Sequence, residues 1–177
     1  MMKDLIGPNA SSLPEEISEL GIPALVYPYS AGVAGGLLGG LAMTIPALVY
    51  GVASGHGPWY PVNLVAATLL PEMRTLPPTA LNAFDPIYLA VGLAIHLTVA
   101  TGLGLIFAML LPTLPGRPHL WALVIGPLLW LAATAVVLPT INPLMSNLLD
   151  WPSFGLANIV YGLTMGLWVA RAGPVPA

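Results

Sequence analysis

His96 is the side chain of this sequence with the clearest chemical potential, because it lies inside a long apolar run. Gly92 precedes it by one helical turn, and a glycine there leaves space beside the imidazole for a flat macrocycle. His96 is therefore a candidate axial ligand for haem or a chlorophyll-type pigment. The alternative is a histidine that bonds to a Thr, Tyr or Asn of a neighbouring helix, since an imidazole in hydrocarbon needs partners. His56 follows the first apolar run and His119 begins the third, so the two would lie on opposite sides of a membrane. Neither is therefore placed as a second ligand for a bis-histidine haem.

Other chemistries have less support in the sequence. A serine–histidine–acid arrangement is not indicated, because neither Ser54 nor Ser146 lies in a nucleophile-elbow motif. The chain has no cysteine, so disulfides, thiolate metal sites and iron–sulfur clusters are excluded. Its net charge of −3 forms no patch suited to nucleic acid. We expect no enzyme activity from the chain itself, no metal and no required cofactor.

Charged residues are almost absent from most of the chain. Between Gly21 and Ala170 they occur only in proline-rich breaks between apolar runs, at Glu72, Arg74, Asp85, Arg117 and Asp150. Only 6% of the residues are charged, whereas a typical soluble domain has about 25%. Since a soluble domain of this size needs a charged exterior, the sequence predicts a protein that is embedded in a lipid bilayer and binds lipids.

Four apolar runs approach the roughly 20 residues that a membrane-spanning helix needs. We predict an all-α integral membrane protein with spans at about 31–54, 86–111, 119–138 and 154–170. They form a transmembrane domain over 29–172, between a polar tail at 1–28 and a short tail at 173–177. Trp151 and Trp168 bracket the last span at interface depth.

Four spans place both termini on the same side of the membrane. Lys3, Arg117 and Arg171 share that side, and Arg74 alone lies opposite. The positive-inside rule therefore predicts that both termini are cytoplasmic.

The chain also reads as one unit used twice, each a helix, a proline-containing apolar connection and a second helix. The second helices match, since His96, Ala100 and Gly104 correspond to Asn158, Gly162 and Gly166 at the same spacing. The connections match around the Asn-Leu pairs at 63–64 and 147–148. We predict two repeated hairpins, with a short interfacial or re-entrant helix in each connection. Trp59 and Tyr60 are interface aromatics of the first.

Small residues cluster on several of the predicted helix faces. Such faces let helix backbones approach closely where lipid removes the hydrophobic drive for association. Two interpretations are open: packing inside the bundle, and docking against helices of another protein. The candidate packing glycines are Gly32, Gly36, Gly40, Gly104, Gly162 and Gly166.

Several short motifs together resemble a group of uncharacterised small bacterial four-helix inner-membrane proteins. They are the segments 39–46, 59–64 and 142–145, with Tyr50-Gly51 and Tyr161-Gly162. The resemblance covers roughly 31–170 and implies a location in the bacterial inner membrane, near respiratory oxidases and related electron-transfer complexes. Its motifs are structural and bring no active-site residues with them.

Together these features predict a non-catalytic accessory subunit of a larger membrane complex, most naturally a respiratory one, in contact with other integral membrane subunits. Its small-residue faces would pack against partner helices. One alternative is a pigment- or haem-binding subunit that uses His96. Another is a small transporter or channel, although the spans contain no charged residue to bind or relay a charged solute.

Overall fold

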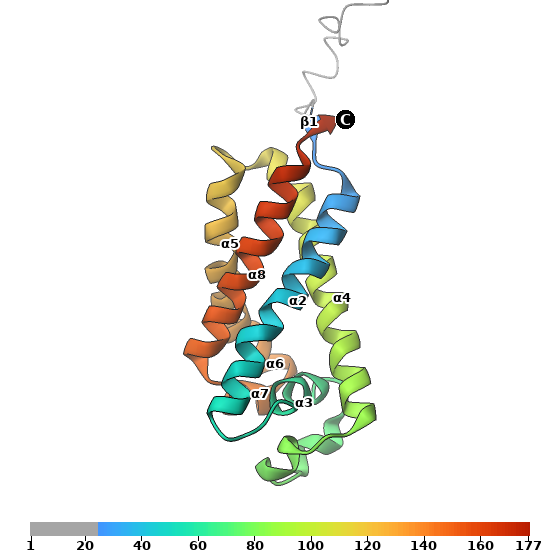
Figure 1. The fold of residues 1–177 in the computed structure, drawn as a ribbon, viewed down its shortest axis with the longest axis vertical. Helices are drawn as coiled ribbons and strands as arrows, with labels where there is room; N and C mark the ends of the chain where they lie inside the picture. Colours follow the sequence, from blue (N-terminus) through green and yellow to red (C-terminus); the bar gives the residue numbers. More distant parts are fainter. Residues whose placement is uncertain (1–24) are drawn as a thin grey trace, which may run out of the picture.

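The computed structural model describes residues 25–177 and has four long helical spans over that range (Figure 1). The first two are α2 (Tyr29–Ala53) and α4 (Pro86–Leu110). The third consists of α5 (Pro118–Ala132), a π-helical turn η4 (Ala133–Val137) and α6 (Leu138–Ile141), and the fourth is α8 (Trp151–Ala172). All four are long and apolar enough to cross a membrane, which confirms the predicted all-α membrane class. The predicted tail at 1–28, including Lys3, lies mostly outside the described residues.

The last span starts earlier than the sequence predicts, at Trp151 instead of 154. Asp150 caps the helix, because its carboxylate accepts a hydrogen bond of 2.9 Å from the backbone N–H of Ser153. Pro152 sits in the first turn, where its missing N–H costs nothing. The apolar run alone therefore underestimated the helix.

Helices α2 and α8 form the centre of the bundle, and α4 and α5 flank them (Figure 1). Helix α2 packs on both α4 and α8, and α8 also packs on α5. By contrast, α4 and α5 barely contact each other, although only η3 (Leu111–Thr113) and a short loop separate them in the chain. The bundle is thus closed between α2 and α8 and open between α4 and α5.

Glycines set the close approach of the central helices. A Cβ at Gly36 would contact the Ala100 carbonyl of α4, and one at Gly39 would lie 2.9 Å from Tyr161 of α8. A Cβ at Gly162 would lie 2.8 Å from the Cα of Gly126 in α5. Because real side chains do not tolerate these separations, each helix pair depends on a glycine surface.

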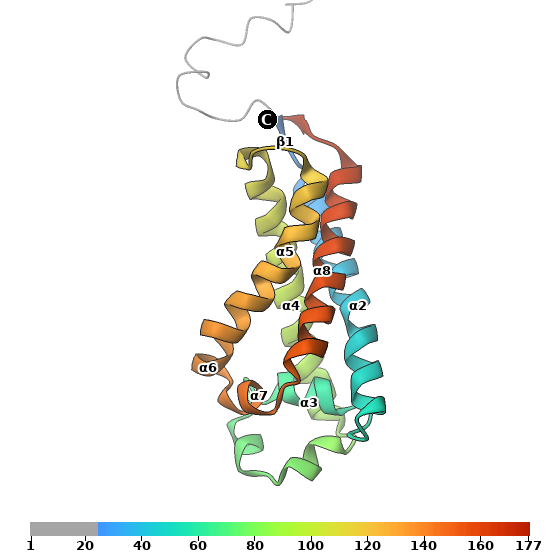
Figure 2. The same ribbon diagram turned by 90° about the vertical axis from the view of Figure 1, so that its left-hand side faces the viewer.

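The two connections opposite the chain ends fold into one layer, which we call the cap. It contains α3 (Tyr60–Ala66), η1 (Pro71–Thr75), η2 (Pro78–Asn82) and α7 (Pro143–Leu148). Figure 2 shows these short helices across the lower end of the bundle. At the other end β1 (Leu25–Val26) pairs antiparallel with β2 (Val175–Pro176), which joins the two ends of the described chain.

Candidate functional site

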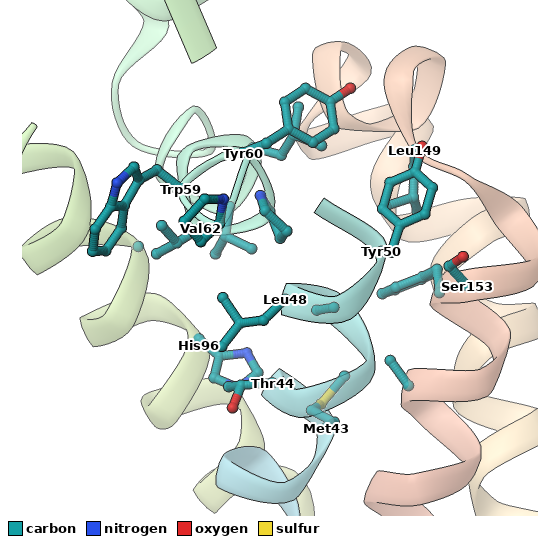
Figure 3. A pocket seen from close by; sticks show the side chains of 18 of the residues that line it. Met43, Thr44, Leu48, Tyr50, Trp59, Tyr60, Val62, His96, Leu149 and Ser153 are labelled. Atoms are coloured by element: carbon teal, nitrogen blue, oxygen red, sulfur yellow. The ribbon is translucent and has the colours of Figure 1, made fainter. Parts of the chain in front are cut away.

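A cavity of about 340 Å³ lies between α3 and the interior of the bundle, where α2 passes between α4 and α8 (Figure 3). In Figure 3 the cap is at the top, so the cavity lies beneath α3. Its walls are almost entirely apolar and include Met43 and Leu48 of α2, Val62 of α3, Leu93 of α4 and Ala157 of α8. The volume is at the lower end of the range of about 300–1,000 Å³ that is usual for small-molecule sites. The cavity can therefore accommodate a compact apolar molecule.

Two buried asparagines hold the cap over the cavity. The Asn63 side-chain N–H donates to the carbonyl oxygens of Leu81 and Ala83, at 2.8 and 2.9 Å. The Asn142 side chain donates to the carbonyl of Leu64 at 2.8 Å and accepts from the backbone N–H of Met145 at 3.0 Å. Since buried backbone carbonyls need partners, these amides fix the turns that position α3 and α7.

His96 lines the cavity on the side away from α3, as Figure 3 shows. Its Nε2 lies 2.8 Å from the carbonyl oxygen of Gly40 on α2. A carbonyl oxygen only accepts, so Nε2 carries the proton and donates. In a neutral ring the other nitrogen, Nδ1, then has a free lone pair, and no group in residues 25–177 donates to it.

The arrangement around His96 does not fit the axial ligation of a macrocycle. Nε2, the nitrogen that reaches farthest from the backbone, is already bonded to the Gly40 carbonyl. The space beside Gly92 is filled by α3, because a Cβ there would meet both the carbonyl and the side chain of Val62. The glycine that suggested room for a pigment instead allows α3 to pack on α4.

The rim of the cavity has the more polar groups. Asp150 and Ser153 lie at the start of α8, and hydrogen bonds from the Ser153 side chain and backbone N–H lower the pKa of the Asp150 carboxyl. Trp59 packs on Phe84 with ring centroids 4.8 Å apart. The hydroxyl of Tyr60 donates to the Leu148 carbonyl at 3.1 Å, which ties α3 to α7.

The four predicted interface aromatics occupy different environments. Trp151 and Trp168 are about two-fifths exposed, at 39% and 44%, near opposite ends of α8. Trp59 is half-buried at the cavity rim. Tyr60 is only 3% exposed, and burial in the cap raises its pKa. Tyr60 therefore acts as part of the cap core, in a stacked contact with His56.

The predicted packing glycines lie between helices of this chain. These glycines lie where α2 meets α4 and where α8 meets α5. A Cβ added at any of the six would come within 3 Å of another helix of the chain; they are Gly32, Gly36, Gly40, Gly104, Gly162 and Gly166. Their surfaces are consequently covered by the chain's own helices. The exposed faces of the bundle are formed mainly by larger apolar side chains such as Leu123 and Ile45.

Sequence reasoning missed the cavity and the role of Asn142. The signal for Asn142 was its position directly before Pro143, a pattern typical of a residue that caps a short helix. No signal for the cavity exists in one segment, since its walls come from five helices. Within residues 25–177, no group of three or more His, Cys, Asp or Glu side chains could hold a metal ion.

No protein-family model matches the chain, and no significantly similar curated protein or solved structure is found.

Proposed function

We propose that the protein is a non-catalytic membrane protein that binds a neutral, apolar small molecule in the cavity beneath α3. The observation that carries this proposal is the position of the cavity: it lies between helices of membrane-spanning length and has almost no polar wall. A charged or strongly polar molecule would lose its hydration there without gaining partners. An apolar molecule has no polar groups to desolvate there and gains van der Waals contacts with the walls.

The cap favours entry from the bilayer over entry from water. Met73 and Leu81, one in each of its two 3₁₀ turns, are fully buried, and Leu64 of α3 packs with them. Leu48 and Leu93, by contrast, line the cavity and are also exposed on the lipid-facing side of α2 and α4. A molecule dissolved in the membrane therefore reaches the site between these two helices.

Filling the cavity tests the proposal. Ala47 lines it, and Ala90 on α4 faces outward near the same end of the bundle. We expect purified wild-type protein and Ala90→Phe to retain an apolar molecule that mass spectrometry detects after solvent extraction. Ala47→Phe should lose it while keeping the same unfolding temperature within a few degrees. Equal retention by folded Ala47→Phe would contradict the proposal.

We also propose that the protein acts within a larger membrane assembly, most naturally a respiratory one, in the bacterial inner membrane. The third span supports this idea, because its half at the capped end leans away from α8 (Figure 2). There η4 and α6 contact α5 and the cap, with few contacts to α8, and Val136 is 64% exposed. Single π-helical turns such as η4 frequently lie at functional sites.

Native electrophoresis in mild detergent tests this second proposal. At native expression we expect the protein to migrate with other subunits, and Val136→Trp to weaken that association. Ile45→Trp is the matched control, because Ile45 on α2 is equally exposed at 64%. Migration of the wild type alone or as a simple homo-oligomer would overturn the proposal.

For orientation, we propose cytoplasmic chain ends and a periplasmic cap, in line with Arg117 and Arg171 at one end and Arg74 at the other. The absence of native cysteine allows a direct test. A membrane-impermeant thiol reagent applied to intact cells should label Thr75→Cys in the cap and spare Ala172→Cys. The reverse labelling would invert the topology.

We further propose that the bundle arose from two copies of one hairpin. Ala100 and Gly104 of α4 meet glycines of α2, much as Gly162 and Gly166 of α8 meet Gly126 and Ala122 of α5. A two-fold symmetric pair of hairpins would pack α4 on α5 as closely as α2 packs on α8. The gap between α4 and α5 is then a departure from that symmetry. Homologues with a closed α4–α5 contact would be the expected intermediates.

A further inference from the structure

The floor of the cavity presents hydrogen-bond acceptors. His96 donates through Nε2 to the Gly40 carbonyl, which leaves Nδ1 as a lone pair. The hydroxyl of Thr44, which also lines the cavity, donates to the Leu41 carbonyl at 2.6 Å and so offers only its oxygen lone pairs. Both side chains lie on the side away from α3 in Figure 3.

The groups that could donate lie elsewhere or are already used. Tyr60 donates its hydroxyl proton to the Leu148 carbonyl, and Ser153 lies at the start of α8, where its backbone N–H donates to Asp150. Trp59 and Tyr50 are at the rim next to the cap, at the opposite side of the cavity from His96 (Figure 3). A molecule that fills the site thus meets the His96 and Thr44 side chains on the side away from α3, and both already donate to backbone carbonyls.

We infer that the ligand is a neutral apolar molecule that carries a hydroxyl donor, an apolar alcohol or phenol, and that His96 Nδ1 accepts its O–H. This inference rests on the proposed binding function and specifies its ligand. A hydrogen bond from such a hydroxyl to His96 is stronger in this apolar site than in water, because no solvent competes for either group. A ketone or ether of the same shape has only acceptors and would place its oxygen against another lone pair.

A matched pair of ligands tests the inference without changing the protein. In nanodiscs containing the full chain, we would measure the dissociation constants of 4-octylphenol and its methyl ether, 4-octylanisole, corrected for partition into empty nanodiscs. The ether replaces the O–H of the phenol by O–CH₃ and so keeps the oxygen as an acceptor but removes the donor. We expect the phenol to bind about three- to tenfold more tightly, the ratio that one hydrogen bond provides.

Two variants assign the preference to His96. In His96→Phe the preference should disappear while the ether still binds. His96→Gln should restore part of it, because the amide N–H can donate to the Gly40 carbonyl and its oxygen can accept. If His96→Phe does not fold, the comparison of phenol and ether in the wild type still tests the ligand class, and a reduced preference in His96→Gln still tests the role of His96.

The outcomes separate the two proposals. Equal binding of phenol and ether to the wild type would overturn the inference and leave an apolar binding site in place. A preference that persists in folded His96→Phe would overturn the assignment to His96. Saturable binding of neither compound would overturn both the inference and the proposed function.

Discussion

The side-chain amide of Asn142 donates a hydrogen bond of 2.8 Å to the backbone carbonyl of Leu64, 78 residues earlier in the chain. The same amide group reaches Thr68 at 2.9 Å, and its oxygen accepts from Met145. Asn142 is completely buried. One side chain therefore joins the two connections that form the cap, and it does so directly behind the wall of the cavity.

Replacing Asn142 should loosen the cap. In Asn142→Ala the Leu64 carbonyl and the Met145 N–H lose their partners in a buried place, so we expect the free energy of unfolding to fall by about 2–3 kcal/mol. Asn147 lies in the same connection and is exposed, so Asn147→Ala should change it by less than about 0.5 kcal/mol. Denaturant unfolding in detergent measures both. Equal effects would show that the Asn142 bonds do not organise the cap.

The glycine surfaces predict opposite changes in stability when alanine replaces two glycines that are two residues apart. A Cβ at Gly104 would lie 2.5 Å from the Cα of Gly36, whereas one at Gly102 would have no atom of another helix within 4 Å. Gly104→Ala should separate α2 from α4 and cost about 1–3 kcal/mol by overpacking. Gly102→Ala should be neutral or slightly stabilising, since alanine favours helix. Thermal unfolding of both variants checks this, and a tolerated Gly104→Ala would refute the close α2–α4 contact.

A buried hydroxyl links helices α4 and α8. Tyr161 on α8 donates to the Ala100 carbonyl on α4 at 2.6 Å. Because hydrogen bonds between membrane helices contribute about 0.6 kcal/mol on average, Tyr161→Phe should lower stability by roughly that amount. Tyr29→Phe, at an exposed position on α2, is the control. A loss in Tyr29→Phe as large as in Tyr161→Phe would mean that the measured effect is not this hydrogen bond.

Asp150 predicts an acid-sensitive start of α8. Hydrogen bonds from Ser153 lower the pKa of its carboxyl below the ordinary value of 3.8, so the unfolded chain takes up the proton first. The stabilisation is complete above that ordinary pKa and is lost as the pH falls through the lower, folded-state pKa. Unfolding measured between about pH 5 and pH 2 should show a steeper loss for the wild type than for Asp150→Asn. Parallel curves would contradict a native-state bond to the carboxylate.

The sequence was sufficient for the membrane class, because the four spans are long apolar runs with prolines at their ends. Finer features depend on contacts between distant segments. The Asn-Leu match paired Asn63 with Asn147, but Asn63 is buried and Asn147 is exposed, and the buried asparagine of the second connection is Asn142. Which asparagine turns inward depends on where α3 lies.

His96 and Gly92 illustrate the same limit within the candidate site. Their spacing led us to expect a macrocycle beside the helix or a Thr, Tyr or Asn partner for His96, but local spacing does not say which group lies there. In the structure it is Val62 of α3 for Gly92 and the Gly40 carbonyl for His96. Both are tertiary contacts, which local spacing does not encode.

The two glycine faces of α2 have a consequence for biosynthesis. The face with Gly36 is covered by α4, the next span to be made, whereas the face with Gly39 waits for α8, the last one. Until α8 emerges from the ribosome, that groove can only be lined by lipid or by the insertion machinery. The first hairpin therefore enters the membrane with one of its glycine faces uncovered, and truncated chains that end before Trp151 should be the forms that quality-control proteases remove.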